Sequence, residues 1–145
     1  MTTTRLIGSA PNQVPRNRDL GGMAYQDSKA IASTGTLGFG LGSGAGGAVT
    51  QITSRTTGVT LNNSTGAITL FSAAGSTTAA TFTVTNSQVA VNDVITLNQQ
   101  TGTNLYVLLV TKVLAGSFNI TLYTTGGTTT EAPIINFAVI KGSAN

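Results

Sequence analysis

The fold of this chain is decided by the stretch Ala80–Thr85, which reads ATFTVT. Phe82 and Val84 fall on one side of an extended chain and the threonines on the other, because successive side chains of a β-strand point to opposite faces. The segment SFNITLY at Ser117–Tyr123 repeats this alternation with three apolar side chains on one face. Both stretches therefore predict strands with one buried and one solvated face.

Six further short segments rich in apolar and β-branched residues surround these two, and clusters of Gly, Asn, Ser and Thr separate them. They are Val49–Thr53, Val59–Leu61, Ala67–Phe71, Val94–Asn98, Leu105–Val113 and Ile134–Ile140. About eight strands at this spacing are typical of a sandwich or barrel, so we predict an all-β protein with a single β-sandwich or jelly-roll-like domain. Leu105–Val113 is the most apolar of the segments, and we expect it to be a central strand.

The chain divides into three parts by composition. Residues 1–32 are predicted to be an extended N-terminal arm, because Pro11 and Pro15 disfavour helix and no hydrophobic periodicity is present. Residues 33–48 are rich in glycine and are predicted to be a flexible hinge. Residues 49–145 are predicted to form the β-sandwich.

The composition argues against an enzyme and against a bound cofactor or metal. The chain has no His and no Cys, which removes the commonest catalytic base and the usual ligands of zinc. Its four carboxylates are isolated from one another in the sequence: Asp19, Asp27, Asp93 and Glu131. The best enzymatic alternative would combine Asp93, Glu131 and a lysine at a subunit interface.

Charged residues make up 8% of the chain, against about 25% in ordinary globular proteins. A free monomer normally carries more charge for solubility, so we expect a homo-oligomer or a subunit of a larger assembly. The net charge of +3 is not arranged in a Lys/Arg stripe, so no nucleic-acid partner is expected. No targeting signal and no apolar run long enough to span a membrane is visible, so we expect synthesis in the cytoplasm and no membrane partner.

Three segments resemble virion structural proteins of tailed bacteriophages: Val14–Asp27, Val49–Leu61 and Ile135–Lys141. A chain of this length with one arm and one β-domain is most similar to a capsid decoration (cement) protein. The resemblance implies a location on the capsid surface of the virion, a homo-oligomer that is typically a trimer, and the major capsid protein as partner. It also implies that the arm binds the shell through Arg16 and Arg18, which would pair with acidic groups, and through the apolar anchors Leu20, Met23 and Tyr25.

The alternative within this resemblance is a head or tail fibre module that attaches to a host-surface glycan. Aromatic rings and amides recognise sugars by stacking and hydrogen bonding. Tyr106, Tyr123 and the amides at residues 98–100 are the candidates for such a surface.

Overall fold

The computed structural model describes residues 32–33, 39–40 and 45–143. Its contacts divide the chain into two units, Met1–Ala45 and Gly46–Asn145. In the first unit, β1 (Ala32–Ser33) pairs antiparallel with β2 (Phe39–Gly40). The arm residues expected to bind a partner lie outside the described residues, and their role stays a prediction: Arg16, Arg18, Leu20, Met23 and Tyr25.

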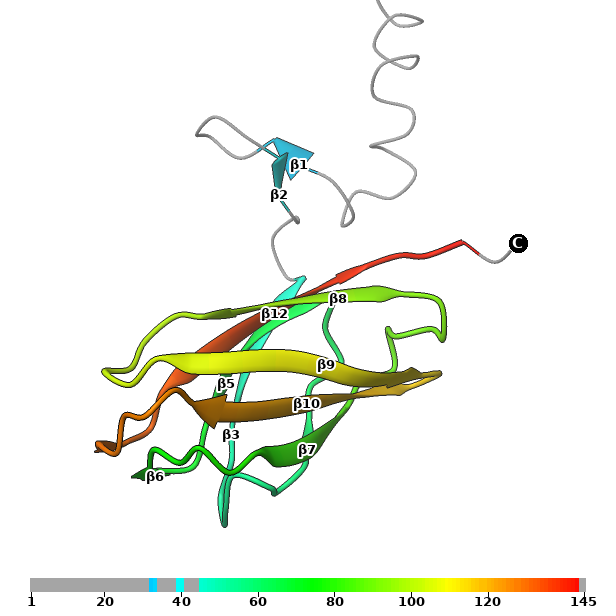
Figure 1. The fold of residues 1–145 in the computed structure, drawn as a ribbon. Coiled ribbons are helices and arrows are strands. Elements are labelled where there is room, and N and C mark those ends of the chain that lie inside the picture. Colours follow the sequence, from blue (N-terminus) through cyan, green and yellow to red (C-terminus); the bar gives the residue numbers. More distant parts are fainter. Residues whose placement is uncertain (1–31, 34–38, 41–44, 144–145) are drawn as a thin grey trace, which may run out of the picture. The chain divides into compact units, whose positions relative to one another are not determined.

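The second unit, called the β-domain here, contains two four-stranded sheets. Sheet I has the order β4 (Val59–Thr60), β7 (Ala80–Thr85), β10 (Ser117–Thr124), β9 (Tyr106–Leu114). Sheet II has the order β3 (Gly46–Thr50), β5 (Thr65–Thr69), β12 (Ile134–Ile140), β8 (Val94–Gln99). A separate pair joins β6 (Ala73–Ala74) to β11 (Thr130–Glu131). All described residues that are regular are strands, which confirms the all-β, sandwich-like fold (Figure 1).

Neighbouring strands are antiparallel except β3 with β5 and β4 with β7, which are parallel. A parallel pair needs a crossover between its strands, whereas an antiparallel pair can be joined by a tight turn. The turn at Ala115 and Gly116 joins β9 to β10 in this way, and Gly116 adopts a φ of +84° that favours glycine. This turn lies between the predicted strand segments Leu105–Val113 and Ser117–Tyr123.

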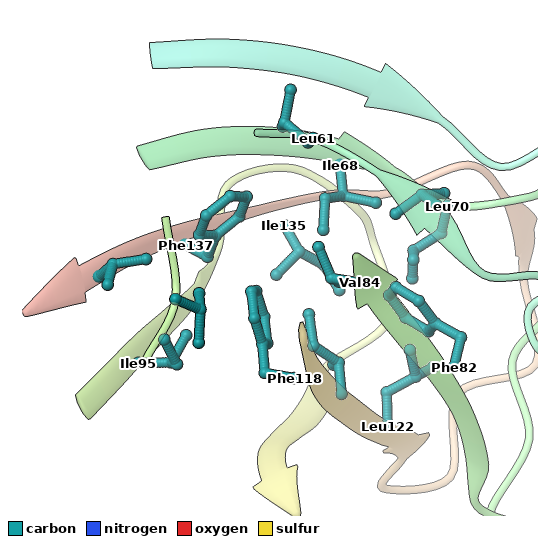
Figure 2. Close-up of a cluster of buried hydrophobic side chains, with 14 of the residues drawn as sticks. Leu61, Ile68, Leu70, Phe82, Val84, Ile95, Phe118, Leu122, Ile135 and Phe137 are labelled. Atoms are coloured by element: carbon teal, nitrogen blue, oxygen red, sulfur yellow. The ribbon is translucent and has the colours of Figure 1, made fainter. Parts of the chain in front are cut away.

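The core lies between the two sheets and is made of side chains from both (Figure 2). The rings of Phe118 from sheet I and Phe137 from sheet II lie 5.3 Å apart between centroids, tilted by 59°. Such a tilted arrangement is a favoured geometry for aromatic pairs. The other buried members include Ile68, Leu70, Phe82, Val84, Ile120, Leu122 and Ile135.

The alternation read from the sequence is confirmed on both strands that it rested on. Phe82 and Val84 of β7 are buried between exposed threonines, and β10 alternates buried and half-buried residues along its whole length. Each of the eight predicted segments overlaps a strand of one of the two sheets. The first of them is displaced, because β3 covers residues 46–50 and so includes the last three residues of the expected hinge.

The prediction that Leu105–Val113 is a central strand was wrong, because β9 pairs only with β10 and lies at the edge of sheet I. Its apolar run does not indicate burial on two faces. Leu109 is 46% exposed and Leu114 is 45% exposed, so the outer face of the strand carries apolar side chains in contact with solvent. A strand that is buried on both faces and an edge strand with apolar side chains on both faces have the same continuous apolar run in the sequence. The sequence therefore could not distinguish them.

Candidate functional site

The β-domain contains five charged side chains among its described residues: Arg55, Asp93, Lys112, Glu131 and Lys141. In a chain without His or Cys, these side chains are the main candidates for acid–base catalysis or for binding a charged ligand. Their surroundings therefore decide whether the domain contains a site for catalysis or ligand binding.

Arg55 lies in the loop between β3 and β4 and is buried. Its Nε donates to the Phe71 carbonyl at 2.9 Å, and its Nη2 donates to the carbonyls of Ala73 at 2.7 Å and Glu131 at 2.8 Å. Its Nη1 donates to the Tyr106 hydroxyl at 2.8 Å, and the guanidinium carbon lies 5.2 Å from the centroid of that ring. The planar fork of donors thus joins four separate segments of the chain.

Glu131 continues this set of contacts. Its carboxylate accepts from the backbone N–H groups of Thr103 at 2.5 Å and Asn104 at 2.9 Å. These two N–H bonds, with a further hydrogen bond from Tyr106, hold the pKa of the Glu131 carboxyl below its ordinary value, although partial burial acts in the opposite direction. Arg55, Asn104, Tyr106 and Glu131 together are called the Arg55 network below.

Asn104 is buried in this network, and all its polar groups are bonded. Its Nδ2 donates to the Thr129 carbonyl at 2.8 Å, and its Oδ1 accepts from the Thr129 N–H at 3.2 Å. Its carbonyl accepts from the Gln99 side-chain amide at 2.8 Å. The network therefore fixes the loop after β8 against the segment before β11.

Asp93 and Lys141 form a second charged site. Lys141 Nζ lies 2.5 Å from Asp93 Oδ2, and the Asp93 side chain is fully buried whereas that of Lys141 is 63% exposed. The backbone N–H groups of Ala90 and Gly142 donate to the same carboxylate at 2.8 and 3.0 Å. Burial raises the pKa of the Asp93 carboxyl, but the bond from Lys141 and the two N–H bonds together bring that pKa below its ordinary value of 3.8.

The structure does not bring Asp93 and Glu131 together. Asp93 precedes β8, whereas the residues that bind Glu131 follow β8. A six-residue strand separates the two carboxylates by about 20 Å. No group of three or more His, Cys, Asp or Glu side chains suited to a metal occurs among the residues that the structure describes.

The outer face of sheet I is lined by hydroxyls and an amide. Thr121 Oγ1 lies 2.8 Å from the hydroxyl of Thr81 and 2.9 Å from that of Thr111, and Thr83 donates to Asn119 Oδ1 at 3.0 Å. These contacts cross from β7 through β10 to β9. Called the outer threonine face here, this surface is polar over β7 and β10, where its groups bond one another, whereas β9 adds the apolar side chain of Leu109 opposite Thr121.

The two tyrosines suggested as a sugar-binding surface lie in different surroundings. Tyr106 is buried and bonded to Arg55, so the prediction that its ring forms part of a sugar-binding surface was wrong. Tyr123 is half-buried beside the outer threonine face, on the same side of β10 as Asn119 and Thr121. Of the amides at residues 98–100, Gln99 binds the N–H of Tyr106 and the carbonyl of Asn104 instead of facing solvent fully.

Sequence reasoning missed the buried polar residues that organise the loops. Besides Arg55 and Asn104, Gln51 accepts from the Phe71 N–H and donates to the Thr57 carbonyl, and Asn86 donates to the Asn63 carbonyl. A single arginine between two short strands, in a chain with so few charges, was the available signal for Arg55. The amides give no such signal, because Asn and Gln are mostly found at exposed positions.

No family model matches this chain, and neither a curated protein nor a solved structure matches it at a significant level. Within the described part of the chain, no helix is long and apolar enough to cross a membrane.

Proposed function

We propose that this chain is a non-catalytic structural protein that acts by binding other protein surfaces as a homo-oligomer. The observation that carries the proposal is how the charged groups of the β-domain are engaged. Arg55, Asp93, Glu131 and Lys141 all hold loops to strands through hydrogen bonds or an ion pair. Catalytic and ligand-binding groups are instead usually directed toward an accessible site, with pKa values adapted to the reaction.

The outer surfaces support the same proposal. Lys112 is the one charged residue on the strands of sheet I, and sheet II carries none among its described strands. An uncharged surface can approach another protein with little desolvation cost for ions. A nucleic-acid partner would require a basic stripe, which these strands lack.

The particular role we propose is that of a bacteriophage capsid decoration (cement) protein located on the virion surface. The resemblance of residues 14–27, 49–61 and 135–141 to virion proteins supports this role. In this proposal the β-domain is the rigid body, and the arm with Arg16 and Arg18 binds the major capsid protein. The contacts with the shell would add free energy only in the assembled lattice, and would thereby stabilise it.

Quantitative mass spectrometry of purified virions tests this role. A copy number near that of the major capsid protein is expected for a decoration protein, and a chain lacking residues 1–30 should keep its β-domain but no longer bind shells. A copy number of a few per particle would contradict the decoration role. That result would favour the fibre alternative, for which glycan binding by the outer threonine face and Tyr123 would then be measured. Absence from virions would contradict both.

A further inference from the structure

The four edge strands of the two sheets differ in how they are protected against pairing with another chain. An edge strand presents unpaired backbone N–H and C=O groups, and proteins usually block such edges with short strands, charges, bulges or covering segments. β4 has two residues. β9 carries Lys112 and an irregular register at the neighbouring position, where β10 shifts between Asn119 and Ile120. The first strand of sheet II, β3, begins with two glycines, and the Asn63 side chain donates to its Gly46 carbonyl at 3.2 Å.

β8 lacks the short length, the charge, the bulge and the glycines that protect the other edges. β9 lies near β8 without pairing with it, and the Gln99 side chain at the end of β8 is bonded to Asn104 and Tyr106. β8 reads VITLNQ, without charge, proline or glycine, and its register with β12 runs from Val94 to Gln99 without a bulge. No strand of the described residues pairs with its other edge. Among the edge strands of the two sheets, β8 is therefore the one whose sequence and register do least to prevent pairing.

The direction of the free backbone groups follows from the hydrogen bonds at the end of β8. The Gln100 N–H donates to the Ile134 carbonyl at 2.8 Å, so residue 100 faces β12. Since the bonding direction alternates along an antiparallel strand, residues 94, 96 and 98 face β12 as well. The N–H and C=O groups of Ile95, Leu97 and Gln99 then point away from the sheet.

We propose that β8 pairs antiparallel with β8 of a second copy of this chain, about a two-fold axis at Leu97. This register places Ile95 opposite Gln99 of the other copy, so that the outward-pointing donors and acceptors of the two strands meet. The long bond of 3.4 Å from the Asn98 amide to the Gln99 carbonyl would be replaced in the pairing. On the outer face it places Thr96 opposite Asn98 of the other copy, twice by symmetry. The strand is thus complementary to itself, as an isologous contact requires, and no like charges face each other.

The second copy is favoured over an unrelated peptide by this self-complementarity and by the low charge of the whole chain. The two four-stranded sheets II would become one continuous sheet across the axis. A pairing of six residues buries less than the roughly 1,200 Å² of a stable complex, so the dimer should form in a concentration-dependent way. This inference rests on the proposed homo-oligomer and specifies one of its contacts, a two-fold pairing of β8 with β8.

Sedimentation equilibrium of the full-length chain and of charge variants tests the pairing. The wild-type mass should rise with concentration toward that of a dimer. In the double variant Thr96→Lys with Asn98→Lys, two pairs of lysines would face each other, and dimerisation should weaken about tenfold. In Thr96→Glu with Asn98→Lys, each glutamate would face a lysine, and dimerisation should be at least as strong as in the wild type.

The matched control is Thr81→Lys with Thr83→Lys, which adds the same two charges to the outer face of sheet I and should leave the wild-type dimer unchanged. Circular dichroism and thermal melts show whether every variant is folded. A wild-type mass that stays monomeric, or an oligomer weakened equally by both lysine pairs, would overturn the proposal. Dimerisation that appears only after deletion of residues 1–30 would also overturn it, in favour of the chain's own arm as the occupant of this edge. None of these results bears on the copy number in virions, so failure of this contact and failure of the decoration role are distinguishable.

Discussion

The two ends of the β8–β12 ladder each contain a buried charge, and they stabilise it in opposite ways. At one end the Arg55 cation is surrounded by three backbone carbonyls and a tyrosine hydroxyl, all neutral. At the other end the Asp93 anion is paired with the Lys141 cation and two N–H groups. Both arrangements hold loops to the sandwich. The direct partners of Arg55 do not titrate at acid pH, whereas Asp93 itself does, and the Glu131 carboxylate titrates beside the Arg55 contacts.

These two arrangements are two ways in which a chain with few charges can hold its loops in place. A cation held by neutral acceptors requires several carbonyls to converge on one point, which only the tertiary fold provides. An ion pair requires two side chains and the turn between them. We therefore expect the Arg55 contacts to be the more costly to disrupt, and the Asp93–Lys141 pair to lose its contribution at acid pH.

The largest effect is expected for Arg55→Met. This change removes the donors of four hydrogen bonds and leaves buried carbonyls unpaired, so we expect the free energy of unfolding to fall by about 3 kcal/mol. Urea titration at pH 7 measures the loss. Arg55→Lys is the matched control, and it should recover little stability because an ammonium cannot reproduce the geometry of the fork. A loss below about 1 kcal/mol for Arg55→Met would show that the network is not a main support of the fold.

A smaller effect is expected for Asp93→Asn, which should lower the free energy of unfolding by about 1–2 kcal/mol at pH 7. The loss is limited because Lys141 is 63% exposed and can turn into water. Lys141→Met, the matched variant, keeps the two N–H bonds to the carboxylate but leaves a buried anion without its cation, so it should lose about as much as Asp93→Asn. Urea titration of the three proteins under one condition provides the comparison.

The pH dependence of these proteins separates the two ends. The pKa of the Asp93 carboxyl is lowered in the folded state, so the stability it contributes is fully present above the unfolded-state pKa near 3.8 and is lost as pH falls through the folded-state value. The gap in melting temperature between wild type and Asp93→Asn should therefore close below pH 4, whereas the gap for Arg55→Met should remain. A gap for Asp93→Asn that is constant from pH 7 to the lowest pH measured would contradict the ion-pair account.

Gly116→Ala tests whether the turn between β9 and β10 and the Asp93–Lys141 ion pair stabilise the β-domain independently of each other. The Gly116 N–H donates to the Val89 carbonyl at 2.9 Å, just before the turn that carries Asp93. No atom of the described residues lies within 4 Å of an added Cβ, so the expected cost of about 1 kcal/mol comes from the φ of +84°. Thermal unfolding measures it, and the cost should be independent of pH. A strongly pH-dependent cost would mean that the hairpin and the ion pair act as one unit.

The smallest effect is expected for Thr121→Val, at the centre of the outer threonine face and away from both charged ends. The hydroxyl bonds to Thr81 and Thr111 are exposed to water, and valine suits a strand, so stability should change by less than about 0.5 kcal/mol. A larger loss in urea titration would show that the hydroxyl contacts of this face support the fold in addition to the two ends.

The sequence could predict the strands because their signal is local. The alternation at residues 80–85 and 117–123 and the glycine at position 116 act within a few residues, and the fold follows them closely. It could not predict that β9 is an edge strand, because strand order depends on pairings between distant segments. The two-residue strands β6 and β11 were missed because each is too short to show a period in the sequence.

The candidate sites divide in the same way. From the sequence alone it follows that the β-domain has no His or Cys and carries few charges, because composition does not depend on folding. Only the tertiary structure decided that Tyr106 is buried under Arg55, that Asp93 meets Lys141 and that Glu131 lies at the opposite end. Arg55 and Glu131 are 76 residues apart along the chain, and Asp93 and Lys141 are 48 apart. Contacts over such separations arise from how two sheets stack and not from any local preference, which is why the strands were visible in the sequence while the partners of the buried charges were not.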